Sequence, residues 1–307
     1  MTALAGILSL AAQTLRISVP YGLAALGGVF SERSGVVNIA LEGILLLGAF
    51  CAVVGTLASG SPYVGIVAAV LGGLAAAALH ALVTVTLKAD QIISGLAINI
   101  VAYGLTRSGL RILYQSASNS PRIPGPEIGA LRGLPGGDSP LGAVLYDPLF
   151  LLTLVLLVLS VRFLFGSGLG LAVRTAGEHP EAAHSAGFSV ARLRWLGVLA
   201  SGLLGGLGGA WLAFEQHSFT DQMSGGRGYI ALAAMIVGKW HPVGAAVACL
   251  LFGAAETAQI RLQGAGVPTQ VLQSLPFILT ILVLVLWVGR SVAPAAVGRP
   301  YDPEGEA

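Results

Sequence analysis

One uncharged stretch constrains this chain more than any other feature: no Asp, Glu, Lys or Arg occurs between Gly43 and Leu87. A helix needs about 20 mostly apolar residues to cross a bilayer, so this stretch is long enough for two crossings. The sequence Ser-Gly-Ser-Pro at 59–62 supplies a turn between them. Charged residues make up only 10% of the 307 residues, whereas soluble domains carry about 25%. These features argue against a soluble enzyme and predict an all-α, polytopic integral membrane protein.

Nine apolar segments are candidates for membrane-spanning helices, so about eight to ten crossings are expected. Segment 228–240 is too short to cross about 30 Å of hydrocarbon alone, so it is a half-helix, a re-entrant element or a span extended by its neighbours. Segment 36–58 follows the polar residues 31–35, which predicts a break at membrane depth. Nine full spans would place the N-terminus outside the cell, whereas one re-entrant element would place it inside. The segments are 5–30, 36–58, 62–87, 91–113, 148–165, 195–217, 228–240, 242–263 and 270–289.

Two hydrophilic stretches differ in character. Residues 114–147 contain five prolines, which is typical of an irregular exposed loop. Residues 166–194 are the more basic stretch, with Arg174, Arg192 and Arg194. The positive-inside rule therefore places 166–194 and the tail 290–307 in the cytoplasm and 114–147 outside. No basic start precedes a short apolar segment with a cleavage site, so no cleaved signal peptide is expected.

The chain is interpreted as a single transmembrane domain, 1–307. Within it, the sequence shows a weak internal repeat. A span, a broken polar stretch, a Gly/Ala-rich element and two further spans describe both 5–113 and 195–289. One linking span, 148–165, separates the two halves, and an odd number of crossings would invert the second half. Inverted repeats with interrupted helices are typical of transporters, with the path at the repeat interface. Chance similarity between apolar sequences is the alternative.

Polar and charged side chains inside predicted spans cost about 2.5–3.5 kcal/mol each on insertion scales, so each needs a reason. Asn38 and Glu42 lie four residues apart, on one helical face. They are interpreted either as part of a polar path or gate, or as hydrogen-bonding groups that fix helix packing. His80 is expected to be a packing residue, and no acidic cluster suggests an ion-coupled pump. The set is Arg16, Asn38, Glu42, His80, Asn99, Arg107, Glu215, Lys239 and Glu256.

Glycine is in excess, with 43 of 307 residues, about twice its usual share. The run 202–209 contains two overlapping small-xxx-small pairs, Gly202 with Gly206 and Gly205 with Gly209. Apolar helices gain little by leaving lipid, so they associate through close backbone packing. This pattern predicts tight helix packing and says nothing about a substrate.

The stretch 174–187 contains two histidines and two glutamates, but its spacing does not suit a metal site. Pro180 suits the first turn of a short helix over 180–186, Glu181 lies favourably near its N-terminus, and Gly187 would end it. A short helix between two spans is interpreted as a docking element, with an ordinary connecting loop as the alternative.

Absent motifs narrow the function further. The chain has no phosphate-binding loop, no Gly-x-Ser-x-Gly and no His-Glu-x-x-His sequence. No catalytic residue, metal site or cofactor is therefore expected, and an ATP-driven process would need ATP and Mg²⁺ on a separate ATPase chain. The net charge of +2 implies no nucleic-acid partner, and membrane lipid is the expected surrounding.

Three ordered blocks resemble a known family. They are Glu32–Gly43, Arg174–Gly187 and the sequence from Gly228 through Lys239-Trp240 to Pro242. Together they resemble ABC importer permeases of the branched-chain amino acid/ribose type, and within that family the nucleoside or simple-sugar subgroup. The resemblance covers roughly residues 20–289, and three blocks in order are more specific than any one.

The resemblance implies a multi-pass permease of the bacterial cell membrane, which pairs with a second permease subunit, often as a heterodimer. It also implies an ABC ATPase that docks on a cytoplasmic coupling segment and an extracytoplasmic substrate-binding protein or lipoprotein. The predicted path residues are Asn38, Glu42, Asn99 and Tyr229, with the alternative that Glu42 holds the break at 32–35. The predicted docking residues are Arg174, Glu178, Pro180, Glu181, Ala182 and Gly187.

The residues leave the substrate and the class of transporter open. A nucleoside follows from the subgroup resemblance, while a simple sugar or another small polar solute remains an alternative. A self-sufficient secondary transporter or channel is the first rival and would need an intramembrane ion site. A membrane scaffold without a substrate path is the second rival.

Overall fold

A computed structural model describes residues 2–126, 139–263, 292–302 and scattered positions between 270 and 285. Within these residues every regular element is helical, and the one β-bridge, between Asn119 and Thr220, stands alone. The all-α prediction is confirmed. Most of the predicted span 270–289 lies outside the described residues, as do 127–138 of the predicted external loop and 303–307 of the tail.

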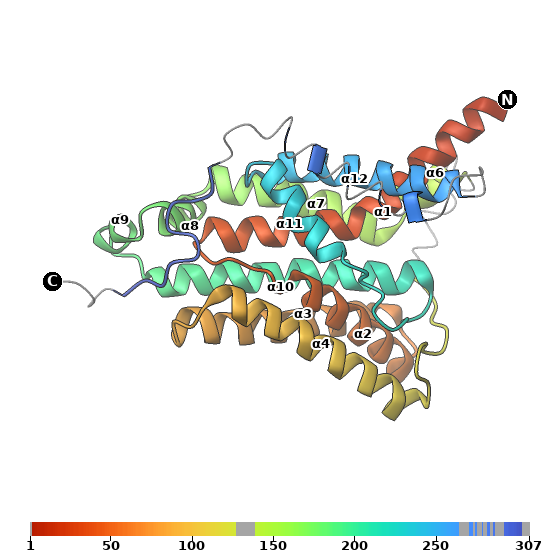
Figure 1. Cartoon of the computed structure of the whole chain (residues 1–307), viewed down its shortest axis with the longest axis horizontal. Helices are drawn as coiled ribbons and strands as arrows, with labels where there is room; N and C mark the ends of the chain where they lie inside the picture. The colour runs from red at the N-terminus through yellow and green to blue at the C-terminus, as the bar shows by residue number, and fades with distance from the viewer. Residues whose placement is uncertain are drawn as a thin grey trace.

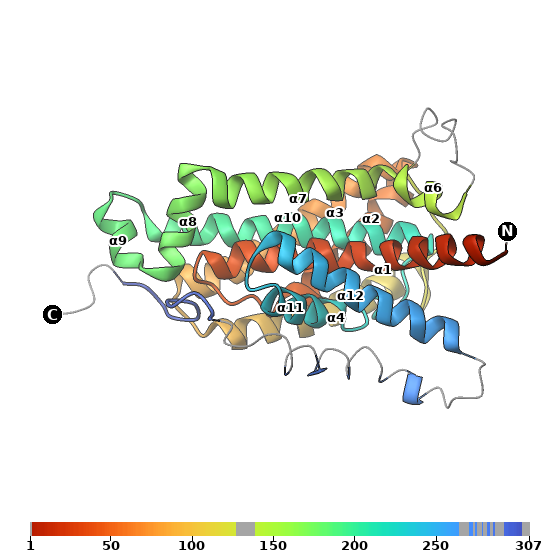
Figure 2. The same ribbon diagram turned by 90° about the horizontal axis from the view of Figure 1, so that it is seen from above.

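The long helices run roughly parallel to the long axis of the molecule (Figures 1 and 2). Within the described residues, five helices are long and apolar enough to cross a membrane: α2, α3 with the following π-helical turn, α7, α10 and α12. The elements in order are α1 (Thr2–Arg33), α2 (Leu41–Ser59), α3 (Pro62–Ala81), η1 (Leu82–Thr86), α4 (Gln91–Tyr114), α6 (Pro140–Leu145), α7 (Pro148–Gly166), α8 (Gly168–Glu178), α9 (Pro180–Ser185), α10 (Val190–Gln216), α11 (Arg227–Val237) and α12 (Pro242–Leu262).

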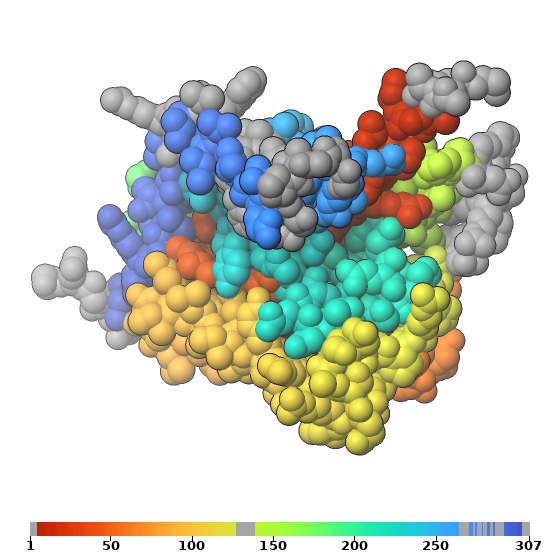
Figure 3. Space-filling model, turned by 45° about the vertical axis from the view of Figure 1, so that its right-hand side comes forward, coloured from red at the N-terminus to blue at the C-terminus, as the bar shows by residue number. Residues whose placement is uncertain are grey.

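Helix α10 is the centre of the bundle. It buries 78% of its most apolar stretch, against 22% for α7 at the periphery. In Figure 1, α2, α3 and α4 lie on one side of α10, and α1, α7, α11 and α12 lie on the other. Helix α4 and the loop after it form a yellow ridge that stands out from the face shown in Figure 3.

The two ends of the bundle carry different segments (Figure 1). One end, named here the α9 end, holds α8, α9 and residues 292–302. The other, the α6 end, holds α6, the start of α1, and the loop after α4, whose Ser120 N donates to Phe219 O at 2.9 Å. The predicted docking segment and the predicted external loop therefore lie at opposite ends, as the predicted topology requires.

Helices α1 and α10 pack side by side and run in opposite directions. Near one end Gly197 faces Phe30, and near the other Trp211 Nε1 donates to the carbonyl of Arg16 at 3.0 Å. An inverted repeat requires this antiparallel pairing of the first helices of its halves. The repeat itself stays a prediction, because most of its last span lies outside the described residues.

The glycine pairs of α10 face two different helices. Gly202 and Gly206 lie against α3, whereas Gly205 and Gly209 lie against α2. A Cβ atom added at Gly206 would lie 2.5 Å from the carbonyl oxygen of Ala69, so a side chain there would push α3 away. Helices in lipid gain little free energy by burying apolar side chains against one another, so they associate through close backbone packing of this kind.

The helix limits differ from the predicted ones at the two breaks. Helix α2 begins at Leu41 rather than at residue 36, because the break, predicted near residues 31–35, lies at 34–40 and α1 continues to Arg33. Helix α11 ends at Val237 rather than at residue 240, because Lys239 and Trp240 adopt positive φ angles of 55° and 52°. Segment 228–240 therefore forms a half-length helix, one of its three predicted forms.

Candidate functional site

The starts of the two interrupted helices, α2 and α11, meet inside the bundle. Glu42, in the first turn of α2, is fully buried. Its Oε1 accepts a hydrogen bond from Gly226 N and its Oε2 accepts one from Gly228 N, both at 2.7 Å. A carboxylate is stabilised at a helix N-terminus by the free backbone N–H groups and by the helix dipole. Glu42 therefore holds the start of α11 against the start of α2.

The side chains of α4 complete this cluster. Asn99 Oδ1 accepts from Gly43 N at 2.8 Å, and Asn99 Nδ2 donates to Ile39 O at 3.0 Å and to Tyr229 Oη at 3.1 Å. Tyr103 Oη donates to Glu42 Oε1 at 3.2 Å. We name Glu42, Asn99, Tyr103 and Tyr229 the polar centre. Tyr229 is 42% exposed, so the cluster reaches the surface of the chain.

Three of the four predicted path residues thus lie together, and the fourth lies elsewhere. Asn38 is fully buried, and its Nδ2 donates to Ser201 Oγ on α10 at 2.6 Å. It therefore makes a packing contact between the break and α10. Tyr103 was not predicted, although its place four residues after Asn99 puts it on the same face of α4. Glu42 contacts the start of α11 rather than residues 32–35.

The break before α2 is satisfied by neighbouring side chains. Val37 N donates to Gln91 Oε1 at 2.7 Å, and Val37 O lies 2.9 Å from His80 Nε2. Ser31 Oγ donates to Val36 O at 2.8 Å. Non-helical backbone at membrane depth needs such partners, because hydrocarbon supplies none. His80, expected to be a packing residue, packs here by holding the carbonyl of the break.

Glycine allows the two helix starts to touch. A Cβ atom added at Gly228 would lie against the backbone nitrogen of Glu42 and 2.5 Å from its Cα. A Cβ atom at Gly43 would lie 2.8 Å from Asn99 Oδ1. Neither position can take a larger residue without moving backbone or breaking a hydrogen bond of the polar centre.

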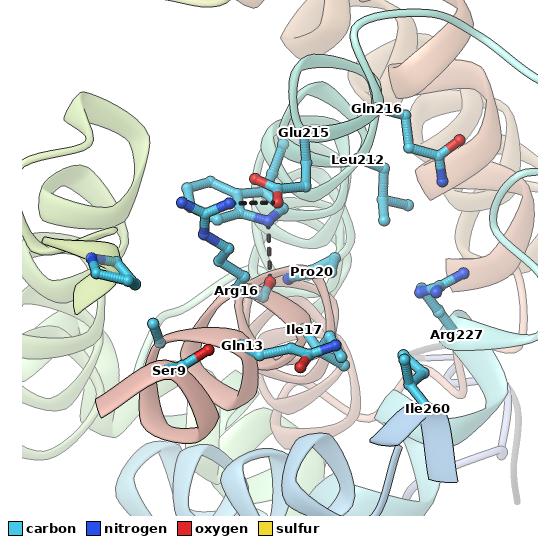
Figure 4. A pocket seen from close by; sticks show the side chains of 13 residues that line it. Ser9, Gln13, Arg16, Ile17, Pro20, Leu212, Glu215, Gln216, Arg227 and Ile260 are labelled. Atoms are coloured by element: carbon cyan, nitrogen blue, oxygen red, sulfur yellow. Dashed lines mark hydrogen bonds and ion pairs between the residues drawn. The ribbon is translucent and has the colours of Figure 1, made fainter. Parts of the chain in front are cut away.

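A cavity of about 430 Å³ lies at the α6 end, between α1, α10 and α12 (Figure 4). Arg16 pairs with Glu215 on one side at 3.2 Å, and Arg227, the first residue of α11, lies on the other. The side-chain amides of Gln13 and Gln216 also line it. Because Arg227 lies between Gly226 and Gly228, the cavity is next to the helix start that Glu42 binds.

The predicted docking segment forms two short helices, α8 and α9, at the α9 end. Helix α9 begins with Pro180 at its first turn, and Gly187 follows with a φ of 84°, close to the predicted limits of 180–186. Glu181 and Ala182 are exposed at the tip, whereas Pro180 is buried. The segment therefore offers a small exposed surface on a fixed base.

Arg174 and Glu178 contact the bundle, whereas Gly187 is exposed. The Arg174 guanidinium lies 4.7 Å from the centre of the Phe165 ring, a cation–π contact. Glu178 pairs with Arg33 at 3.5 Å and also accepts from Ala295 N at 3.1 Å. Arg174 and Glu178 therefore attach the segment to the bundle.

Two helix caps outside the spans have shifted pKa values. Burial raises the pKa of Asp147, which accepts from Leu149 N and Phe150 N at the start of α7. Burial, with the nearby Arg33 charge, lowers the pKa of His241, whose Nδ1 accepts from Val243 N at 3.2 Å. Because that nitrogen accepts a hydrogen bond, the neutral form of His241 is the one that caps α12.

Nearly the whole chain is similar to named permease proteins. The guanosine ABC transporter permease protein NupQ of Bacillus subtilis (strain 168) is 40% identical over 306 residues, covering 94% of each chain. The nucleoside ABC transporter permease protein NupC of Lactococcus lactis subsp. cremoris (strain MG1363) is 38% identical, over 94% of this chain and 95% of that one. The guanosine ABC transporter permease protein NupP of the same Bacillus strain is 28% identical, over 92% and 81%.

The family described as "Branched-chain amino acid transport system / permease component" matches residues 10–285, which include the polar centre, α8, α9 and α11. This match and the identity with NupQ cover nearly all of the chain. The chain is therefore a multi-pass membrane protein that belongs to the family of ABC transporter permease components of the branched-chain amino acid type.

Proposed function

We propose that this chain is the permease subunit of an ATP-driven importer for nucleosides in the bacterial plasma membrane. The identity of about 40% with two permeases named for guanosine and nucleosides carries the proposal. The polar centre supports it, because two helix breaks at membrane depth are typical of a substrate path in transporters.

The path runs from the α6 end to the polar centre. The cavity beside Arg227 is large enough for a small solute and mixes amide, charged and apolar groups, as ligand pockets do. Nucleosides carry hydroxyl and ring donors and acceptors that suit the exposed hydroxyl of Tyr229, which the buried amide of Asn99 holds in place. Asn38, bonded to Ser201, supports the wall of the path rather than contacting solute.

A separate ATPase docks at the α9 end and holds ATP and Mg²⁺. The exposed tip of α9, with Glu181 and Ala182, is the contact surface, while Arg174, Glu178 and Pro180 hold the tip on the bundle. ATP binding to that partner favours one of two conformations of the permease. This chain itself performs no hydrolysis.

A second permease subunit covers the outward face of α4. Ile100, Gly104, Arg107 and Arg111 recur at helical spacing along this face, and all four are exposed. Arg107, which lies 3.9 Å from Asp221, and Arg111 are in the last two turns of α4, where a protein partner would supply acceptors that hydrocarbon lacks. Because one Bacillus strain has two permease relatives named for guanosine, we infer a heterodimer. An extracytoplasmic lipoprotein would deliver the solute to the α6 end.

Uptake by the purified complex tests this function. The complex is isolated through a tag on this chain, placed in proteoliposomes with ATP, and offered radiolabelled guanosine. We expect uptake that requires ATP and that unlabelled nucleosides inhibit more strongly than ribose, glucose or leucine. Stronger inhibition by sugars would mean that the substrate is a sugar rather than a nucleoside. Uptake driven by an ion gradient without any ATPase would establish a secondary transporter instead, and no uptake of any solute would favour a scaffold.

A further inference from the structure

Helix α11 is held at both ends by side chains from other helices. Its start is bound by Glu42 of α2, as described above. Its other end is bound by the last residues of α1: Arg33 Nε donates to Trp240 O at 2.9 Å, and Arg33 Nη2 donates to Lys239 O at 3.3 Å. Trp240 Nε1 donates to Glu32 Oε2 at 2.6 Å. These polar contacts fix where α11 begins and where the chain leaves it.

The turn after α11 depends on these contacts. Lys239 and Trp240 both adopt the left-handed conformation, which is unfavourable for residues with a Cβ atom. Such a conformation persists only where the surroundings hold it. Here the Arg33 guanidinium holds the turn by donating to both of its carbonyl groups. The position of Arg33 therefore determines the position of the end of α11.

The same guanidinium contacts the docking segment. Arg33 Nη1 pairs with Glu178 at the end of α8, two residues before α9 begins. Arg33 thus joins the docking segment to the turn after α11 by hydrogen bonds and an ion pair. The Phe165 ring adds a second connection, since it lies 4.7 Å from the Arg174 guanidinium and 4.6 Å from the His241 ring. A shift of α8 and α9 would act on α11 through these contacts.

Helix α11 is suited to pass such a shift to the polar centre. Its 11 residues form a rigid rod about 16 Å long. One end of the rod lies at Arg33, and the other donates two backbone hydrogen bonds to Glu42. A displacement of one end must then move the other, and with it the hydrogen-bonding pattern around Glu42.

We propose that α11 carries the movement of the docking segment to the polar centre, and that Arg33 is the positioning residue that joins them. This inference rests on the proposed function, because it requires an ATPase at α9. Arg33 touches neither solute nor nucleotide in this arrangement. Its role is to make the hydrogen bonds around Glu42 depend on the position of Glu178.

Two substitutions, Arg33→Ala and Trp240→Phe, first test the link in the reconstituted complex. The measured quantity is guanosine taken up per ATP hydrolysed, which a general loss of folded protein does not change. Arg33→Ala should lower this ratio at least about fivefold, a typical allosteric coupling, while ATP hydrolysis stays within about twofold of wild type. Trp240→Phe should lower the ratio less and in the same direction. Trp240 is buried, so its effect cannot come from contact with the ATPase.

Glu178→Gln and Glu178→Asp separate positioning from docking. The Asp variant keeps the carboxylate and should keep most of the coupling ratio, whereas the Gln variant should lose it. Lys88→Gln is the matched control, because it breaks a 2.7 Å ion pair with Asp302 at the same end without touching α11. Its ratio should equal that of wild type.

Each outcome has one meaning. If Arg33→Ala lowers uptake and ATP hydrolysis in proportion, Arg33 acts in docking and the proposal is wrong. If Trp240→Phe and Arg33→Ala both keep the wild-type ratio, α11 does not carry the movement. If the wild-type complex imports no nucleoside at all, the proposed function fails, and this failure is seen before any variant is compared.

Discussion

The two interrupted helices begin side by side, yet their starts are built from different chemistry. The start of α2 is held by neutral groups, since Asn99 binds Gly43 N and Gln91 and His80 bind the backbone of Val37. The start of α11 is held by carboxylates: Glu42 accepts from Gly226 N and Gly228 N, and Glu256 of α12 pairs with Arg227 at 3.0 Å. Both arrangements satisfy backbone groups that lipid would leave unpaired.

The difference lies in how many contacts fix each start. The break before α2 has partners from α3, α4 and α10, so no single side chain determines it. The start of α11 depends on two carboxylates, Glu42 and the Glu256 that pairs with Arg227, and its other end depends on Arg33. A helix held at two points can change position as one body, whereas a stretch held at many points cannot. The neutral break is therefore interpreted as the fixed wall, and α11 as the mobile part.

The largest effect should come from Glu42. Glu42→Ala leaves two buried N–H groups without an acceptor, and charge-assisted hydrogen bonds of this kind contribute about 1.5–3 kcal/mol each. ATP-dependent guanosine uptake should fall on the order of 100-fold or more. Glu42→Gln keeps one oxygen acceptor and should fall less. Uptake is divided by the amount of the chain in the membrane, so that a loss of insertion is not counted.

Wild-type uptake by both Glu42 variants would contradict the difference drawn between the two helix starts, because α11 would then not depend on the Glu42 carboxylate. Equal, severe losses in both would mean that the charge, rather than the number of acceptors, holds the helix start.

The next effect should come from the contact between the helix starts. Gly228→Ala places a Cβ atom against the backbone of Glu42, so the helices must separate. Overpacking of this kind costs about 1–3 kcal/mol, which predicts a loss of uptake of roughly ten- to 100-fold. Gly22→Ala in α1 is the control, since nothing lies within 4 Å of its added Cβ. A variant at Gly228 that matches the Gly22 control would show that the close approach is unnecessary.

Much of this arrangement could be predicted from the sequence. Runs without charge fix where spans can lie, because each must match the bilayer thickness, and most helix limits fall within a few residues of the predicted ones. Pro180 and Gly187 defined α9 through local rules alone. Asn99 and Glu42 were conspicuous because polar groups in spans are costly and need partners.

The partners themselves could not be predicted. Glu42 and Gly228 are 186 residues apart, and their contact depends on which faces of α2 and α11 meet. Asn38 and Glu42 share a helical spacing, but Asn38 lies before the start of α2, so the two side chains contact different neighbours. The link from Arg33 to Trp240 spans 207 residues and gives no local signal in the sequence.

A smaller effect should come from the neutral start. Asn99→Ala leaves Gly43 N unpaired and should lower uptake about tenfold, since one unsatisfied buried group costs about 1–3 kcal/mol. Asn99→Asp keeps an acceptor for Gly43 N but places a second carboxylate in the cluster and loses the donor to Ile39 O. It should therefore transport no better than the Ala variant. Near-normal uptake by Asn99→Asp would show that charge at this start is tolerated and would remove the contrast with α11.

The smallest effect should come from the tyrosine that joins α4 to the carboxylate. Tyr103→Phe removes one neutral donor to Glu42 at 3.2 Å and leaves both backbone hydrogen bonds of α11 in place. One such bond contributes about 0.5–1.5 kcal/mol, so uptake should fall about two- to tenfold. Because Tyr103 orients Glu42 without touching solute, the loss should be in Vmax rather than in KM. The double variant Tyr103→Phe with Glu42→Gln completes a cycle. Additive losses would mean that Tyr103 acts apart from Glu42, whereas a smaller combined loss would place both in the unit that holds the start of α11.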